Sequence, residues 1–389
     1  MLNQDSGATE KRYAARHSAT ASVSYDTLIV GAGLIGSSIA WLLAKAGLRV
    51  ILSDASKFGN EASAAGAGML APGGEYREFS PTAQLGLQSL DMYPSFIRTL
   101  EKESGLAIDF SKCGAVELAY EHERWESLEK RADVQRRFGI SVDSICTSTL
   151  HELAPGLNLG GLRGALYYPN DSCVAPQDLL KALKIACDRS GVTIVENSPV
   201  KSIHAEQDGV AAVTENGVIK TRSGVLAAGA WSSQIPVSHE DTLVNTPATF
   251  PIKGHIVGYQ LAPGSLGPIL RHGHHYVLQR STGFTLAGSS EERCGFDRSL
   301  NFELVREIHS GACSFYSPLL TARPLREWTG FRPGTDENQP VIERVPGSNL
   351  WLAYGHYRNG ILLTPATAYL VADEILGEIS ELQALPQAN

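Results

Sequence analysis

The pattern of apolar and polar positions becomes regular a short way into the chain. The apolar run Thr27–Val30 predicts a short buried strand, and the glycine-rich segment Gly31–Gly36 follows it without a gap. Residues 37–46 have the Ala- and Leu-rich composition of a helix that ends at Gly47, and 49–53 predict a second strand. This order of strand, glycine turn, helix and strand is typical of a βαβ dinucleotide-binding unit, so the sequence predicts a Rossmann-like domain here.

Helical and strand patterns alternate through the rest of the chain. Apolar residues recur at helical spacing, opposite a charged face, over 84–104, 121–138 and 176–190. Two short alternating runs flank Asn216-Gly217, a dipeptide typical of a hairpin turn. Further strands are predicted at 192–195, 200–205 and 225–230 and within 245–295, and a terminal helix at about 364–378. The mixture predicts an α/β chain that is α+β overall.

Glycine is the unusual feature of the composition. The chain has 389 residues, 43% of them hydrophobic, and its 38 glycines make up about a tenth against an average near 7%. The excess has no collagen period, so it indicates places where the backbone approaches something closely. A formal net charge of -8, from 33 basic and 41 acidic side chains, provides no basic surface for nucleic acid or an anionic membrane.

The start of the chain and the cysteines predict neither export nor membrane insertion. Residues 1–24 are polar and rich in Ala and Ser, without the apolar core of a signal peptide, and predict a disordered tail. No run of 18 apolar residues occurs, and the six cysteines form no CxxC pair, which favours a reducing compartment. We therefore expect a cytoplasmic protein without a membrane span.

The first glycine cluster has the spacing that a dinucleotide pyrophosphate requires. Gly31 permits the tight turn, Gly33 lets the backbone approach the pyrophosphate, and Gly36 lets the helix pack closely on the strand. The N–H groups at the start of the helix then receive the phosphate charge. Asp54, at the end of the second strand, is expected to accept hydrogen bonds from both ribose hydroxyls. These residues alone do not separate FAD from NAD.

The second cluster, Ala62–Pro72, separates the two cofactors. Over seven of its positions it has almost no side chain larger than a methyl group. A flexible linker has the same composition. Because the cluster follows the ribose carboxylate, where a longer cofactor continues past the pyrophosphate, we favour a backbone that lies against a flat ring system.

The third cluster, His356–Leu362, precedes the terminal helix. Asn359-Gly360 before a helical run predicts a helix N-terminus, where backbone N–H groups and the positive end of the dipole favour an anion. Such a helix end would favour the negative charge of a reduced flavin. An ordinary capped helix is the alternative explanation of the pattern.

Three segments carry a family resemblance: ASAAGAGMLAP at 62–72, TGFRPGT at 329–335 and GHYRNGILLTPAT at 355–367. In this order and spacing they resemble the glycine oxidase (ThiO-type) branch of the D-amino-acid oxidase family of flavoproteins, over about residues 25–380. The resemblance implies a Rossmann-like FAD-binding domain and a discontinuous substrate domain built on an antiparallel sheet. The implied FAD-binding domain comprises 25–85, 165–235 and 335–385, and the substrate domain comprises 86–164 and 236–334.

The resemblance also implies FAD that is not covalently bound. Related sarcosine oxidases carry a flavin-linking cysteine near the second motif, whereas Trp328–Pro333 contain none. By resemblance, residues 356–362 surround the flavin ring and Val200 lies beside the adenine. The predicted cofactor-binding residues are Gly31, Gly33, Leu34, Ile35, Gly36, Asp54, Ala55, Ala62, Ser63, Ala67, Gly68, Met69, Val200, His356, Tyr357, Arg358, Asn359, Gly360, Ile361 and Leu362.

Arg332 is the predicted substrate anchor. It stands among apolar and turn residues, where a charge without a partner is costly. A salt bridge to Asp336 or a bound substrate carboxylate would satisfy its planar guanidinium. The resemblance implies the substrate, because the matching family arginine binds the amino-acid carboxylate. It further implies that Tyr276 donates its hydroxyl to the same group and that Arg358 lies on the substrate side.

Two other segments bear on the chemistry. Gly288–Glu291 is polar where some glycine oxidases offer a methionine to the substrate, which leaves the substrate preference open. His272, His274 and His275 have no metal-ligand spacing, so we expect exposed loop histidines and no metal. The chain has no GxSxG motif and therefore no predicted serine nucleophile.

The activity that the resemblance implies is oxidative deamination of glycine or small amino acids to the 2-oxo acid, ammonia and hydrogen peroxide, with molecular oxygen as acceptor. In the ThiO branch this reaction supplies thiamine thiazole synthesis, and family members often form tetramers. Oxidation of sarcosine, other secondary amines or bulkier D-amino acids, or a dehydrogenase with another acceptor, remains an alternative. A related flavoprotein domain acts on tRNA, but the acidic charge disfavours that reading.

Overall fold

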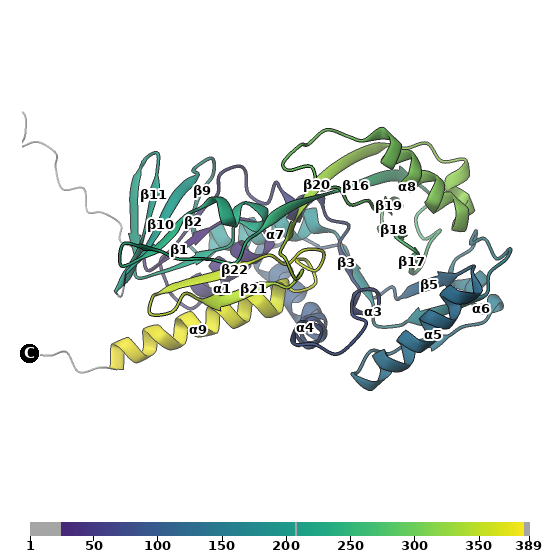
Figure 1. Ribbon diagram of the computed structural model, residues 1–389, viewed down its shortest axis with the longest axis horizontal. Coiled ribbons are helices and arrows are strands. Elements are labelled where there is room, and N and C mark those ends of the chain that lie inside the picture. Colours follow the sequence, from purple (N-terminus) through teal and green to yellow (C-terminus); the bar gives the residue numbers. More distant parts are fainter. Residues whose placement is uncertain (1–24, 207, 385–389) are drawn as a thin grey trace, which may run out of the picture.

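The computed structural model describes residues 25–206 and 208–384, with side chains described up to 377. The tail predicted at 1–24 lies outside the described residues. Figure 1 shows two lobes, one around a six-stranded and a five-stranded sheet and the other around an eight-stranded sheet. The predicted α/β class, with a Rossmann-like part and a second large sheet, is confirmed.

The predicted βαβ unit forms the centre of the first lobe. Strand β1 (Thr27–Val30) pairs in parallel with β2 (Val50–Ser53), and helix α1 (Leu34–Lys45) connects them. The helix starts three residues earlier than the predicted Ser37, because Gly33 in extended conformation already serves as the N-cap. Parallel pairing buries both faces of the sheet, which is why all four residues of each strand are buried.

The six-stranded sheet has the order β21-β22-β13-β1-β2-β9. Its other strands are β21 (Val341–Arg344), β22 (Leu350–Tyr354), β13 (Ser223–Leu226) and β9 (Thr193–Val195). Helix α1 packs against α7 (Pro176–Arg189) and α9 (Thr364–Ala384), and α4 (Pro81–Ser104) packs against the same two helices. In Figure 1 α9 runs along the lower side of this lobe. No helix in the described part of the chain is long and apolar enough to cross a bilayer.

The five-stranded sheet of the first lobe has the order β12-β11-β10-β14-β15. The predicted hairpin is confirmed, since β11 (Gly209–Thr214) turns through Glu215-Asn216 into β12 (Gly217–Thr221). The other strands are β10 (Val200–Glu206), β14 (Val237–His239) and β15 (Thr242–Leu243), and a 3-10 helix η2 (Gly229–Gln234) follows β13.

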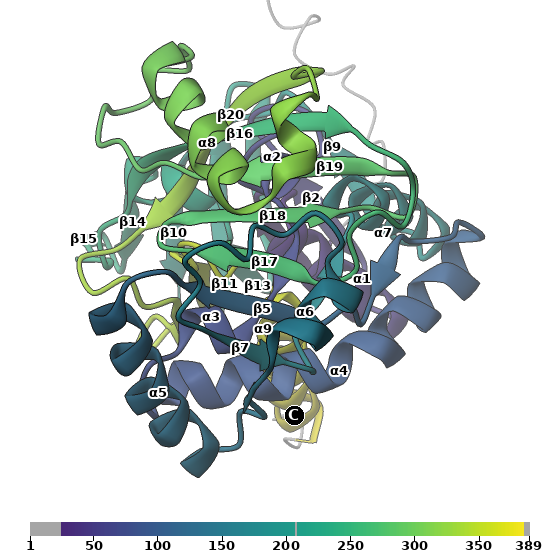
Figure 2. The same ribbon diagram turned by 90° about the vertical axis from the view of Figure 1, so that its right-hand side faces the viewer.

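The second lobe is built on the eight-stranded sheet, in the order β20-β16-β19-β18-β17-β5-β7-β6. Figure 2 shows these strands stacked, with α8 (Phe302–Phe315) against them and α5 (His122–Arg137) to one side. Every neighbouring pair is antiparallel except β17 and β5. The strands are β20 (Arg326–Gly334), β16 (Phe250–Gln260), β19 (Phe284–Gly288), β18 (His275–Gln279), β17 (Ile269–His272), β5 (Ala115–Ala119), β7 (Gly164–Tyr168) and β6 (Asp143–Ser144).

Short elements lie between the two lobes. A three-stranded sheet has the order β3-β8-β4, with β3 (Met69–Leu70), β8 (Ser172–Val174) and β4 (Phe110–Ser111). The four-residue helices α2 (Ala62–Ala65) and α3 (Pro72–Glu75) flank β3. The remaining elements are α6 (Thr147–Leu153) and η3 (Ser317–Leu320). The predicted assignment of chain segments to two domains stays a prediction.

Candidate functional site

A cavity of about 490 Å³ lies at the carboxyl ends of β1 and β2 and extends to β18 and β20. This is the edge of a doubly wound sheet at which ligands bind. Of the predicted site residues, Gly36 and Leu362 do not line it. The cavity is lined by Gly31, Gly33, Leu34, Ile35, Asp54, Ala55, Ala62, Ser63, Ala67, Gly68, Met69, Val200, Tyr276, Arg332, His356, Tyr357, Arg358, Asn359, Gly360 and Ile361, among others.

The glycine turn after β1 leaves no room for side chains. Gly31 has φ +107°, and a Cβ there would lie 2.4 Å from the carbonyl oxygen of Ala227. A Cβ on Gly36 would lie 2.0 Å from the carbonyl oxygen of Gly31, so this glycine serves the packing of α1 on the turn rather than the cavity. Leu34 and Ile35 open α1 and line the cavity, which therefore faces the positive end of the helix dipole.

Asp54 is held by the protein's own donors. Its Oδ2 accepts from the backbone N–H of Ala32 at 2.7 Å, and its Oδ1 accepts from the N–H and the hydroxyl of Ser56 at 2.7 and 3.1 Å. A carboxylate has roughly four lone-pair positions, so three of them are in use. The predicted contact with two ribose hydroxyls therefore requires the Ser56 hydroxyl to turn away.

The small residues of 62–72 form packed structure, so the flexible-linker alternative is wrong. The carbonyl of Ala65 accepts from the indole N–H of Trp328 at 3.0 Å. A Cβ on Gly330 of β20 would lie 2.4 Å from the Cβ of Ala65, and one on Gly68 would lie 1.9 Å from the carbonyl oxygen of Val174. The segment is pressed between β20, β8 and the cavity, which explains why it carries almost nothing larger than methyl groups.

Arg332 lies within β20 and has neutral partners. Its guanidinium donates to the Ser289 hydroxyl and to the Ser290 carbonyl, at 2.9 Å each. Among the described residues it makes no ion pair, so the alternative salt bridge to Asp336 is wrong. Pro333 and Gly334, residue types common in turns, lie inside β20. A cation that faces a cavity and has no carboxylate partner favours an anionic ligand.

Tyr276, on β18, lines the same cavity. The ring is buried, and its burial raises the pKa of the phenol to about 12. The hydroxyl therefore keeps its proton at neutral pH and is available as a donor. A Cβ on Gly288 would lie 2.3 Å from this hydroxyl oxygen, so the glycine opposite in the register makes room for it.

Arg358 has two acidic partners that the sequence did not single out for this role. Its guanidinium lies 3.1 Å from an oxygen of Glu75 and 3.6 Å from one of Glu291. Glu291 also accepts from the hydroxyl of Tyr357 at 2.5 Å. Both acids lie far from Arg358 along the chain, so no local pattern could have indicated the pairing. The charge of Arg358 is thus balanced within the protein, in contrast to Arg332.

His356 is buried and neutral. Its Nε2 lies 3.1 Å from the hydroxyl of Thr367, and burial lowers the pKa of the imidazole to about 4. Residues 360–363 form turns, and α9 begins at Thr364, as predicted. The N-terminus of α9 thus lies about one helical turn beyond Gly360.

The three clustered histidines belong to a hairpin of the large sheet. His272 and His275 are half-buried strand residues, so the expectation of exposed loop positions is wrong for them and correct for His274. His272 lies with its ring edge toward Tyr120, at 5.0 Å between centroids. No group of three potential metal-binding side chains occurs among residues 25–206 and 208–384.

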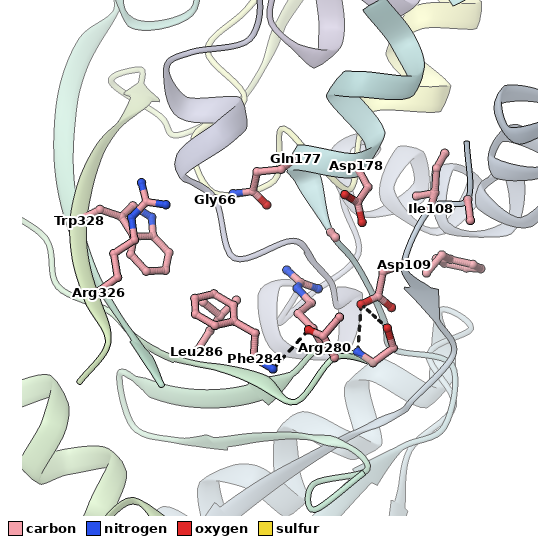
Figure 3. Close-up of a pocket in the computed structure, with 15 residues that line it drawn as sticks. Gly66, Ile108, Asp109, Gln177, Asp178, Arg280, Phe284, Leu286, Arg326 and Trp328 are labelled. Atoms are coloured by element: carbon pink, nitrogen blue, oxygen red, sulfur yellow. Dashed lines mark hydrogen bonds between the residues drawn. The ribbon is translucent and has the colours of Figure 1, made fainter. Parts of the chain in front are cut away.

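A second cavity, of about 700 Å³, was not indicated by the sequence. Figure 3 shows Arg280, Asp109 and Phe284 on one side of it, and Arg326 with Trp328 on another. Gly66 lines both cavities, so the small-residue segment separates them.

Comparisons with known proteins agree with this geometry. The family described as FAD dependent oxidoreductase (DAO) matches residues 26–374. A glycine oxidase of Geobacillus kaustophilus is 31% identical over 352 residues, which cover 90% of this chain and 92% of that protein. A crystal structure of glycine oxidase from Geobacillus kaustophilus superposes with a TM-score of 0.85 at 30% identity, covering 91% of this chain and 95% of that chain. A bifunctional protein ThiO/ThiG of Synechocystis is 31% identical over 91% of this chain and 52% of its own length.

The residues of the first cavity fit FAD. The turn at Gly31 and the start of α1 present backbone and a positive dipole end to a pyrophosphate. The packed segment Ala62–Met69 and the turn His356–Ile361 line the same cavity and supply the surfaces against which a ring system can lie. The cofactor of the family is thus compatible with this chain, and we refer to the first cavity as the cofactor cavity.

Proposed function

The chain belongs to the FAD-dependent oxidoreductase (DAO) family, and on this premise we propose that it oxidises glycine or another small amino acid. The products would be the 2-oxo acid, ammonia and hydrogen peroxide, with molecular oxygen as the final acceptor. The glycine oxidases of similar sequence and structure support this choice of substrate.

The observation that carries the proposal is that Arg332 and Tyr276 line the same cavity. The guanidinium has only neutral partners at 2.9 Å, and the buried phenol remains protonated. Together they offer a cation and a hydroxyl donor to a single carboxylate. Because Arg358 is balanced by Glu75 and Glu291, the site provides one unbalanced positive charge. This favours a substrate with one carboxylate.

Catalysis would consist mainly of orientation. Bound FAD supplies the hydride acceptor for the oxidation. Arg332 and Tyr276 fix the carboxylate, and so the α-carbon hydrogen, relative to the ring. Of the described groups near Arg332, Glu75 and Glu291 are tied to Arg358 and His356 is buried, so no side-chain base is assigned. The imine would then react with water to give the 2-oxo acid and ammonia.

A second candidate acts on sarcosine, other secondary amines or bulkier D-amino acids, or passes electrons to a carrier instead of oxygen. It is favoured by Glu291, a charged residue in the segment where some glycine oxidases offer a methionine. The glycine oxidase proposal includes participation in thiamine thiazole synthesis, which the ThiO/ThiG relative suggests. It also includes a tetrameric state.

The test is an assay of the purified holoenzyme. Visible absorbance of a flavin that acid precipitation releases is expected, because no cysteine lies within Trp328–Pro333. Peroxide release is then measured with glycine, sarcosine and D-alanine, beside dye reduction under anaerobic conditions. Dye reduction without peroxide would indicate a dehydrogenase, and inactivity with every amine would contradict the proposal.

A further inference from the structure

Two cysteines far apart in the sequence meet beside the cofactor cavity. The sulfur atoms of Cys113 and Cys173 lie 3.8 Å apart, and both thiols are free. Cys173 is on β8 and Cys113 follows β4, the strand whose Ser111 pairs with Cys173. A separation this short between sulfurs on neighbouring strands allows a disulfide to form with only a small backbone movement.

A buried guanidinium stands beside Cys173. Arg280 is 7% exposed, donates from Nη2 to the carbonyl of Ala67, and in the described part of the chain its Nη1 has no hydrogen-bond partner. The hydrogen bond from Cys113, followed by the charge of Arg280, lowers the pKa of the Cys173 thiol despite its burial. The pKa of the Cys113 thiol is raised by the same contact and by burial. Of the two sulfurs, Cys173 is therefore the one that ionises more readily.

The pair lies beside both cavities, although neither cysteine lines one of them. The second cavity is lined by Phe110 of β4 and by Ala175, which follows β8. It is also lined by Arg280, which contacts Cys173 and is labelled in Figure 3. That cavity shares Gly66 with the cofactor cavity. Cys173 also pairs directly with Met69 of the cofactor-lining segment. The thiols therefore lie one strand pair away from residues that line the cavity.

We propose that Cys113 and Cys173 form a redox-active pair that hydrogen peroxide converts to a disulfide. Peroxide is the oxidant, and its origin in turnover rests on the proposed function. The Cys173 thiolate attacks one peroxide oxygen, the O–O bond breaks, and the leaving hydroxide takes up a proton as water. The Cys113 sulfur then attacks the resulting sulfenic sulfur and the S–O bond breaks. The hydroxide leaves as a second water with the Cys113 proton. Two thiols lose two electrons, and one peroxide is reduced to two waters.

The disulfide affects the cofactor-lining segment. Oxidation removes the ionisable Cys173 thiol beside Arg280, whose guanidinium also donates to the carbonyl of Ala67. It also draws β4 toward β8, and the backbone N–H of Val174 in β8 donates to the carbonyl of Gly68 at 2.9 Å. A change in the flavin absorbance spectrum on oxidation, reversed by dithiothreitol, is the expected signature.

The deciding experiment treats the purified holoenzyme with added hydrogen peroxide in the absence of substrate. Remaining thiols are alkylated, and the protein is digested and mapped by mass spectrometry. A cross-linked peptide that contains Cys113 and Cys173, and that dithiothreitol reverses, is expected. In Cys113→Ser, dimedone should trap a sulfenic acid on Cys173. If both cysteines remain fully alkylatable after peroxide has oxidised Cys146, the proposal is overturned.

Matched variants separate the pair from general oxidation. Cys146 is exposed, and hydrogen bonds from Ser148 and Thr149 lower its pKa to about 6, so Cys146→Ser removes a competing thiol and should retain the cross-link. Arg280→Gln should slow cross-linking by about tenfold or more, as expected if the pKa of Cys173 rises by one unit. An unchanged rate in this variant would count against the role of the guanidinium.

A second arm keeps the proposed function distinct. The enzyme turns over glycine in air, with and without catalase, and the cross-link is measured in each sample. Cross-linking by added peroxide but not during turnover would support the pair and count against peroxide production. Cross-linking during turnover that catalase suppresses would support both.

Discussion

Arg332 donates a hydrogen bond to the hydroxyl of Ser289 at 2.9 Å, so the cation that lines the cofactor cavity has a neutral partner. Its second donor is satisfied by the carbonyl of Ser290. Arg358, in the same cavity, instead lies between Glu75 and Glu291. Two arginines of the same site thus differ in what they offer: one is already balanced, and the other retains its attraction for an anion.

Replacement of Arg332 by Gln should lower kcat/KM for an amino acid by about 100-fold or more, which is roughly 3 kcal/mol. The reason is the loss of the unbalanced charge that we propose as the anchor of the substrate carboxylate. Steady-state kinetics measures the effect. The control is Arg326→Gln, which should remain active. Arg326 is on the same strand but stacks on Trp328 outside the cofactor cavity. Similar kinetics of the two variants would contradict the role of Arg332.

Replacement of Tyr276 by Phe should raise KM by roughly tenfold, because a hydrogen bond to a charged group contributes about 1.5–3 kcal/mol. Since the pKa of this phenol is about 12, KM should show no phenol ionisation below pH 10. Tyr259→Phe removes a buried hydroxyl that lies 2.9 Å from His309 instead, and should change stability but not KM. Equal KM values for Tyr276→Phe and the unaltered enzyme would exclude the contact.

His255 should act on the substrate through Arg332. The backbone N–H of Asn301 donates to Nε2 of His255 at 3.0 Å, so Nδ1 carries the hydrogen and donates to the Ser290 hydroxyl at 2.8 Å. The backbone carbonyl of the same residue, Ser290, accepts from Arg332, so His255 holds the residue that positions the guanidinium. We expect His255→Leu to raise KM by about fivefold or more with a smaller change in kcat, since a lost hydrogen bond of about 1 kcal/mol loosens the anchor. His255→Asn, which keeps a donor near Nδ1, should recover most of the affinity, and failure of this rescue would indicate a merely structural role.

Gly36→Ala should reduce FAD content and thermal stability. The added Cβ would lie 2.0 Å from the backbone oxygen of Gly31, so α1 or the glycine turn must shift. Gly377→Ala is the matched control, because this glycine is also in a helix and has no atom within 4 Å of the added Cβ. It should stabilise the protein by roughly 0.5–1 kcal/mol through helix propensity. Flavin absorbance per chain and the Tm of both variants decide the comparison.

The stability of the folded protein should depend on His356 in the acid range. Burial lowers the pKa of its imidazole from 6.5 to about 4, so between these values the unfolded chain binds a proton that the folded chain does not. Stability from this group is therefore complete above pH 6.5 and is lost progressively as the pH falls to about 4, by roughly 3 kcal/mol. Thermal unfolding from pH 7 to pH 4.5 should show a steeper loss for the unaltered protein than for His356→Gln. Parallel curves would contradict the assignment.

The sequence predicted those parts that depend on neighbouring residues. The βαβ unit follows from the period of apolar positions and from Gly31, whose φ of +107° no larger residue adopts without strain. The hairpin at Asn216-Gly217 and the start of α9 at Thr364 are equally local. The small residues of Ala62–Pro72 correctly indicated a close approach of the backbone, which the 2.4 Å between the Cβ of Ala65 and a Cβ on Gly330 confirms, but they did not identify the neighbour.

The partners of charged and reactive groups were decided only by the tertiary structure. The sequence left open a salt bridge between Asp336 and Arg332. The register of β20 instead brings Ser289 and Ser290 to the guanidinium. Glu75 pairs with Arg358 across 283 positions, and Cys113 meets Cys173 across 60. Local pattern specifies which backbone conformations are accessible, whereas electrostatic and sulfur contacts depend on distances of a few ångströms. Those distances are set by which strands pair and in what register.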